Sequence, residues 1–208
     1  MKMKKFVALA LAAVMAVSVL AGCGGGGSGV SGSVSTSQVN NLLHKAGSDI
    51  TVTAPSSFKS AVKSTAEELV KAGTVKNSAA ATTKINTKMG EPSFGLMFTS
   101  GRFSMAYILS EREIEAGGQA SSMAAMLGLS GTNFGNLGWV DTPEGVAAAI
   151  VLGIDGGIET YINRFLNVLP GGAKVDADYA VSASKMYDSN DVAYWLIGVE
   201  VSASWTVA

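Results

Sequence analysis

The 208-residue sequence contains a single cysteine, Cys23, and a single histidine, His44. One cysteine excludes an intramolecular disulfide, so the folded part of the chain depends on its own hydrophobic core. One histidine excludes metal sites with two or more imidazole ligands and makes a Ser-His-Asp triad hard to build. We interpret His44 as an ordinary surface or packing residue near the start of the folded part.

Charged residues are also scarce, and part of the resulting hydrophobicity belongs to the N-terminus rather than to a fold. Lys2, Lys4 and Lys5 precede a run from Phe6 to Leu20 that carries no charge. The run is about 15 residues long, whereas a helix needs roughly 20 residues to span a bilayer. A positive start followed by a short apolar run is typical of a secretory signal peptide.

The signal ends in Leu20-Ala21-Gly22-Cys23. This tetrapeptide resembles the lipobox of bacterial lipoproteins at all four positions, and the resemblance covers residues 1–23 only. It implies that diacylglycerol is transferred to the sulfur of Cys23 and that residues 1–22 are removed. Two acyl chains anchor a protein stably. The resemblance therefore implies an extracytoplasmic protein held by lipid in the cell membrane, or in the outer membrane of a source that has one.

Cleavage before Cys23 alters the charge. Residues 23–208 hold 12 basic and 16 acidic residues, a net charge of −4. The segment 23–90 is basic, and the segment 91–208 is acidic. The basic segment either rests on anionic headgroups or forms a solvated face, and we favour the solvated face. Net acidity and export argue against nucleic acid as a partner.

Three regions follow from this pattern: a signal peptide at 1–22, a lipidated cysteine with a Gly/Ser-rich tether at 23–36, and one domain at 37–208. The tether is too poor in apolar residues to fold, and coil scaling gives it a reach of roughly 20 Å. The domain is large enough to bury a core without disulfides.

Helical periodicity predicts several helices in the domain. Capping signals support three of the starts: Pro55-Ser56, the capping box at 110–113, and Asp141-Thr142-Pro143-Glu144. Gly117-Gly118, Asp155-Gly156-Gly157 and Pro170-Gly171-Gly172 are expected to break or end helices. The predicted helices cover residues 37–46, 56–72, 119–129, 146–154 and 158–169, and we interpret 76–92 as a loop or weak helix.

Alternating apolar residues predict two β-hairpins. The first covers 94–109 with a tight turn at Ser100-Gly101, and the second covers 175–205 with its turn at Asp188-Ser189-Asn190-Asp191. Residues 49–53 alternate weakly. We expect the two antiparallel hairpins to form one sheet with a helical layer on one face, which is an α+β fold.

No segment carries a defensible catalytic, cofactor or metal motif. Lipid on Cys23 removes the only thiol, and the glycine pairs lack the spacing of a phosphate loop. The turn at 188–191 lacks the glycine and glutamate of an EF-hand. Carboxylates remain for glycoside hydrolysis, although most sit at helix starts, where capping is their usual role. The candidates are Glu111, Glu113, Glu115, Asp141, Glu144, Asp155 and Glu159.

Aromatic residues are the remaining candidates for a binding surface. Five of them, three tyrosines and two tryptophans, lie in the last hairpin, and Trp139 lies in a Gly-rich loop. On an open sheet face they would suit an envelope protein, a glycan or an apolar ligand, whereas core packing is their default role. The residues chosen as this surface are Trp139, Tyr179, Tyr194, Trp195 and Trp205.

The sequence thus favours a membrane-anchored extracytoplasmic lipoprotein whose domain is a non-catalytic binding or structural module of the cell envelope. The alternative is a cell-envelope hydrolase that uses paired carboxylates. A two-lobed solute receptor is disfavoured because 186 residues are short for two lobes and a hinge.

Overall fold

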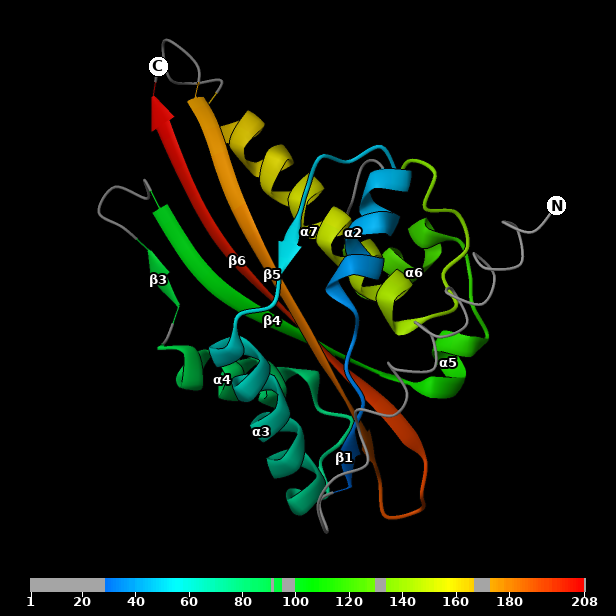
Figure 1. Ribbon diagram of the computed structural model, residues 1–208. Coiled ribbons are helices and arrows are strands. Elements are labelled where there is room, and N and C mark those ends of the chain that lie inside the picture. Colours follow the sequence, from blue (N-terminus) through cyan, green and yellow to red (C-terminus); the bar gives the residue numbers. More distant parts are fainter. Residues whose placement is uncertain (1–28, 91, 95–99, 130–133, 167–172, 208) are drawn as a thin grey trace, which may run out of the picture.

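The computed structural model describes residues 29–90, 92–94, 100–129, 134–166 and 173–207. A single sheet forms its centre (Figure 1). The long strands β5 (Ala173–Tyr187) and β6 (Ala193–Val207) make an antiparallel hairpin, and β4 (Ser100–Ser110) pairs with β6 along its whole length. This arrangement confirms the predicted α+β fold with both hairpins in one sheet.

Short strands complete the two edges of the sheet. At one edge β3 (Ser93–Phe94) pairs antiparallel with β4. At the other edge β5 pairs antiparallel with β1 (Val30–Ser31) and parallel with β2 (Val52–Thr53). The predicted turn at Ser100-Gly101 was wrong, because Gly101 lies inside β4 and pairs with both Phe94 and Ala203. Residues 95–99, which include most of the predicted first strand, lie outside the described residues.

Helices cover both faces of the sheet, which corrects the expectation of helices on one face. Alternate strand residues such as Tyr179, Val181 and Ile197 join a core with α2 (Thr36–Lys45), α5 (Glu111–Glu115), α6 (Ala120–Met126) and α7 (Pro143–Leu166). Their neighbours Ala180 and Leu196 join a second core with α3 (Ser56–Ala72) and α4 (Ser78–Met89). The hairpin strands therefore have few solvent-facing apolar positions, because each face buries its own helical layer.

Most local predictions agree with these elements. The predicted helices 37–46 and 56–72 correspond to α2 and α3, and Gly73 ends α3 in the left-handed conformation. Ser110 and Glu113 form the predicted capping box at the start of α5. The predicted helix 119–129 is found as the shorter α6, after the break at Gly117-Gly118. No helix of the described residues combines the length and the apolar character that crossing a membrane requires.

The predicted break at Asp155-Gly156-Gly157 was wrong. A single helix, α7, runs from Pro143 to Leu166 and passes through these residues. Each glycine costs a helix up to about 1 kcal/mol. Burial of apolar side chains before the glycines, such as Ile150 and Ile154, and partial burial of Ile158 after them offset this cost. The end of the second predicted helix, at 167–169, lies outside the described residues.

Segment 76–92 contains a regular helix, α4, where a loop or weak helix was expected. Its stability comes from its contacts with β4. Ser78, Thr82 and Asn86 lie four residues apart and face the edge of that strand. Their side-chain oxygens accept hydrogen bonds from the backbone N–H groups of Ile108, Ala106 and Ser104 at 3.1, 2.9 and 2.9 Å. These polar side chains form hydrogen bonds with backbone groups of β4 that would be unpaired at an open sheet edge.

Part of the segment predicted to be an unfolded tether pairs with the sheet. Val30 and Ser31 pair with Met186 and Lys185 of β5, and Ser35 caps α2 by accepting a hydrogen bond from the N–H of Gln38. The domain therefore begins by residue 29 and not at residue 37.

Candidate functional site

The structure does not bring the candidate aromatic residues together on one surface. Tyr179 and Tyr194 are only 2% and 8% exposed, and they belong to the cores on opposite faces of the sheet. The expectation of a shared surface has to be corrected for these two residues, because β-strand alternation separates odd-numbered from even-numbered positions. Core packing is their observed role.

The tryptophans occupy separate places. Trp195 is partly buried against the first core, and its ring lies against Gly32. Trp139 is 59% exposed and lies over Gly117, where even a methyl group would overlap its indole ring. Trp205 belongs to β6, and its side chain lies outside the described residues. Trp139 is thus the one predicted aromatic residue that the structure shows largely open to solvent.

Four of the seven candidate carboxylates have structural partners. Glu113 caps α5, and hydrogen bonds from Ser110 lower the pKa of its carboxyl group. Glu111 binds the Lys185 ammonium, and Glu144 accepts a hydrogen bond from the N–H of Ser35 at 3.1 Å. Asp155 accepts a hydrogen bond of 2.6 Å from the Tyr179 hydroxyl. Glu115 and Asp141 are exposed, and the side chain of Glu159 lies outside the described residues.

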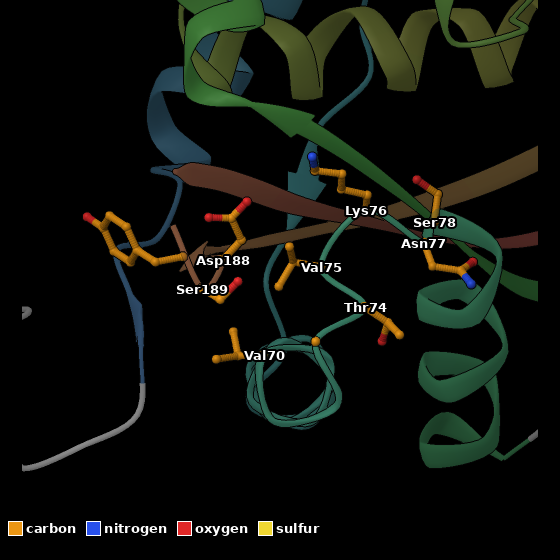
Figure 2. A pocket seen from close by; sticks show the side chains of 10 residues that line it. Val70, Thr74, Val75, Lys76, Asn77, Ser78, Asp188 and Ser189 are labelled. Carbon is orange, nitrogen blue, oxygen red and sulfur yellow. The ribbon is translucent and has the colours of Figure 1, made fainter. Parts of the chain in front are cut away.

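A hollow of about 780 Å³ lies between the α3–α4 loop and the turn that joins β5 to β6 (Figure 2). We call it the turn groove. Figure 2 shows Asp188 and Ser189 on one side of it and the loop carrying Lys76 and Asn77 on the other. The groove is lined by Val70, Gly73, Thr74, Val75, Lys76, Asn77, Ser78, Tyr187, Asp188 and Ser189.

Local sequence determines both walls of the groove. Gly73 ends α3 in a left-handed conformation, and Asn77 then begins α4 by accepting a hydrogen bond from the N–H of Ala80 at 2.9 Å. On the opposite wall Asp188 closes the hairpin turn, because its Oδ1 accepts hydrogen bonds from the N–H groups of Asn190 and Val192 at 2.9 and 3.0 Å. Asp191 adopts a positive φ of 59° in the same turn.

Lys76 supplies the positive charge of the turn groove. Its Nζ lies 5.3 Å from the centre of the Tyr194 ring, a cation–π arrangement. The pKa of this ammonium is raised, first by its interaction with the Tyr194 side chain and to a smaller extent by the negative charges of Asp188 and Glu113. Lys76 also lines a smaller hollow with Ile108 and Glu113. The side chain therefore stays protonated and suits binding better than proton transfer.

A second polar hollow of about 290 Å³ lies at the opposite end of the sheet, where Asp176 and Asp178 lie near Arg102. Both aspartates are exposed, so neither lies in the apolar surroundings in which a general acid of a glycoside hydrolase is held. Beside this hollow the buried Glu200 accepts hydrogen bonds from Nε and Nη2 of Arg102 at 3.1 and 2.8 Å. These contacts form a structural ion pair. They do not bring together the acid and the base that hydrolysis requires.

The turn groove therefore has the features of a binding site. Its ammonium is protonated, and its carboxylate is engaged by two backbone amides. Among the described residues, no three His, Cys, Asp or Glu side chains lie close enough to hold a metal ion. Sequence reasoning had noted the 188–191 turn but missed Lys76, and the two meet only in the folded chain. The one local signal was a lysine and an asparagine three and four residues after Gly73.

Comparisons with protein-family models, with curated proteins and with solved structures found no match to the chain.

Proposed function

We propose that this protein is a bacterial lipoprotein, exported and anchored to a membrane by lipid on Cys23. The observation that carries the proposal is Leu20-Ala21-Gly22-Cys23 at the end of a positively charged and then apolar N-terminus. In the sequence Cys23 lies seven positions before Val30, the first residue of β1.

In this proposal the domain is a non-catalytic binding or structural module of the cell envelope. The turn groove supports a binding role through its size, its protonated Lys76 and its partly apolar wall at Val70 and Val75. The envelope partner is a protein, a glycan or an apolar ligand. Lys76 favours the first two, because an ammonium binds carboxylate, phosphate and hydroxyl oxygens.

The alternative of a carboxylate hydrolase is less well supported. Glycoside hydrolysis requires two carboxyl groups roughly 5–10 Å apart, one of which is held protonated by its surroundings. Asp176 and Asp178 line a hollow together, but both are exposed. We therefore keep the binding module as the proposed function.

Metabolic labelling tests the anchor. The full chain is expressed in a bacterium supplied with a fatty acid that carries an alkyne, and it is compared with its Cys23→Ser variant. We expect label on the wild type only, and a mature mass that lacks residues 1–22. Wild-type protein that carries no label and partitions into the aqueous phase of a detergent extraction would refute lipidation.

Pull-downs from solubilised envelope test the binding module. We expect Lys76→Ala to lose a partner that the lipidated wild type retains. Lys59→Ala is the matched control, because Lys59 is an exposed lysine on α3 that does not line the groove. Equal recovery of all partners by both variants would argue against the turn groove as the binding site, and Trp139→Ala then tests the remaining exposed aromatic residue.

A further inference from the structure

The chain enters the fold at the rim of the turn groove. The N–H of Tyr187 donates a hydrogen bond of 3.1 Å to the carbonyl oxygen of Gly29. A methyl group at Gly29 would lie 3.7 Å from Cγ1 of Val70. Tyr187 and Val70 both line the groove. The strand β1 that follows pairs with the last residues of β5 and so fixes this entry point.

Only residues 24–28 separate this entry point from Cys23. Six residue steps span at most about 20 Å when fully extended, and about 13 Å on average as a flexible coil. Within β6, the eleven residue steps from Ala193 near the turn to Ser204 cover roughly 35 Å. The connection to Cys23 is therefore shorter than the sheet is long.

The surface around the entry point suits a lipid headgroup layer. Val192, in the β5–β6 turn, is 41% exposed and adds an apolar side chain to this end of the molecule. The charges nearby are balanced, with Lys71 and Lys76 against Asp188 and Asp191. Because positive and negative charges are balanced, this surface neither attracts nor repels anionic lipid strongly. The short connection to Cys23 therefore determines which end of the domain lies nearest the bilayer.

We infer that the end of the molecule formed by the β5–β6 turn and the α3–α4 loop faces the lipid bilayer, held there by the short connection to Cys23. This inference rests on the proposed lipidation of Cys23. It places the turn groove beside the headgroups, and it directs the polar hollow around Arg102 and Asp178 away from the membrane.

Energy transfer from the domain to the bilayer tests this orientation. Once Cys23 is lipidated the chain has no other thiol, so a donor dye can be attached at one introduced cysteine. Ser189→Cys lies in the β5–β6 turn and Ser204→Cys lies near the far end of β6, and both serines are exposed. Each lipidated variant is reconstituted into phosphatidylcholine vesicles that contain acceptor lipids. We expect several-fold more efficient transfer from Ser189→Cys than from Ser204→Cys, with little change on adding salt.

Two measurements distinguish a failure of the proposed lipidation from a failure of the proposed orientation. Flotation with the vesicles reports lipidation, so a variant that does not float refutes the proposed anchor. Variants that both float but transfer equally, or a stronger signal from Ser204→Cys, overturn the orientation. Inserting twenty Gly/Ser residues between Cys23 and Gly29 doubles the average reach or more and should reduce the difference between the two positions. A difference unaffected by this insertion would overturn the tether as its cause.

Discussion

At the scale of single residues, close packing leaves little freedom at the centre of the sheet. Gly198 lies in β6 opposite Ala106 and Ser182. A Cβ atom at this position would lie 2.8 Å from Cγ2 of Val62 and 3.2 Å from Cζ of Phe58. The glycine is therefore what allows α3 to approach the sheet so closely.

Gly198→Ala is expected to destabilise the protein by about 1–3 kcal/mol, because the added methyl group overpacks a core that cannot expand freely. Urea unfolding followed by circular dichroism gives the free energy of unfolding. In a Val62→Ala background, Gly198→Ala should lower the free energy of unfolding by less than it does in the wild type. The Val62→Ala substitution removes the side chain nearest the new methyl group. Strictly additive effects of the two substitutions would contradict this contact.

At the scale of elements, α4 shows how a weakly apolar segment becomes a helix. Its apolar positions are few, but its polar stripe of Ser78, Thr82 and Asn86 matches the backbone spacing of β4. Asn86 makes two hydrogen bonds of 2.9 Å with Ser104, donating to its carbonyl oxygen and accepting from its N–H. A side chain that is buried and bonded in this way is a structural part of the sheet edge.

Asn86→Ala should cost about 2–3 kcal/mol, because it leaves the N–H and C=O of Ser104 buried without their partners. Thr83→Ala is the matched control on the exposed face of α4, where the hydroxyl bonds only to Ala79 within the helix. Alanine is the better helix former there, so the control should change stability by less than about 0.5 kcal/mol. Similar losses in both variants would mean that helix propensity, and not the edge contact, stabilises α4.

Glu68 joins α3 to α4 by contacting both Lys84 and Lys88 at 2.6 Å. Hydrogen bonds from these two lysines lower the pKa of the Glu68 carboxyl group from 4.5 to about 2. A lowered folded-state pKa contributes stability above the unfolded-state value, and the contribution is lost as the pH falls toward 2. The ion pairs are partly exposed, so solvent screening limits their contribution to below about 1 kcal/mol.

We therefore expect the stability difference between wild type and Glu68→Gln to be present at pH 7 and to shrink between about pH 4.5 and 2. Unfolding measured in urea across this range tests it. Glu67→Gln removes a neighbouring carboxylate from the same helix without touching the Lys84 and Lys88 contacts. A Glu68→Gln difference that is constant with pH would contradict the lowered pKa.

The comparison between sequence and structure is clearest at this scale. Helix α3 was predicted with its bounds, because Pro55, Gly73 and a regular apolar stripe all agree. Helix α4 and the uninterrupted α7 were missed, because the first is stabilised by hydrogen bonds to a distant strand and the second by burial that outweighs two glycines. Local patterns contain neither contribution.

At the scale of the whole molecule, two cores share one sheet. Neighbouring residues of β5 and β6 enter opposite cores, as Ala180 and Leu196 do on one face and Val181 and Ile197 on the other. Loss of either helical layer therefore exposes apolar residues on strands that the other layer also needs, and the two cores should unfold together.

Urea unfolding followed by tryptophan fluorescence and by far-ultraviolet circular dichroism should accordingly give coincident transitions. Leu43→Ala in α2 and Leu69→Ala in α3 weaken different cores, and both side chains are fully buried. Each should lower the midpoint of the same single transition, with a loss of about 2–5 kcal/mol. A separate early transition in either variant would show that the two helical layers unfold independently.

The sequence alone determined the basic and then apolar N-terminus, the helix capping signals, the alternation of the long strands and the scarcity of histidine and cysteine, because these depend on composition or on residues close together in the chain. Only the tertiary structure decided which aromatic residues are buried, that both faces of the sheet are covered, and that Lys76 lies across a groove from Asp188. Those outcomes depend on contacts between residues far apart in sequence. Periodicity can indicate that a residue faces a core, but it cannot indicate which helices pack over that residue.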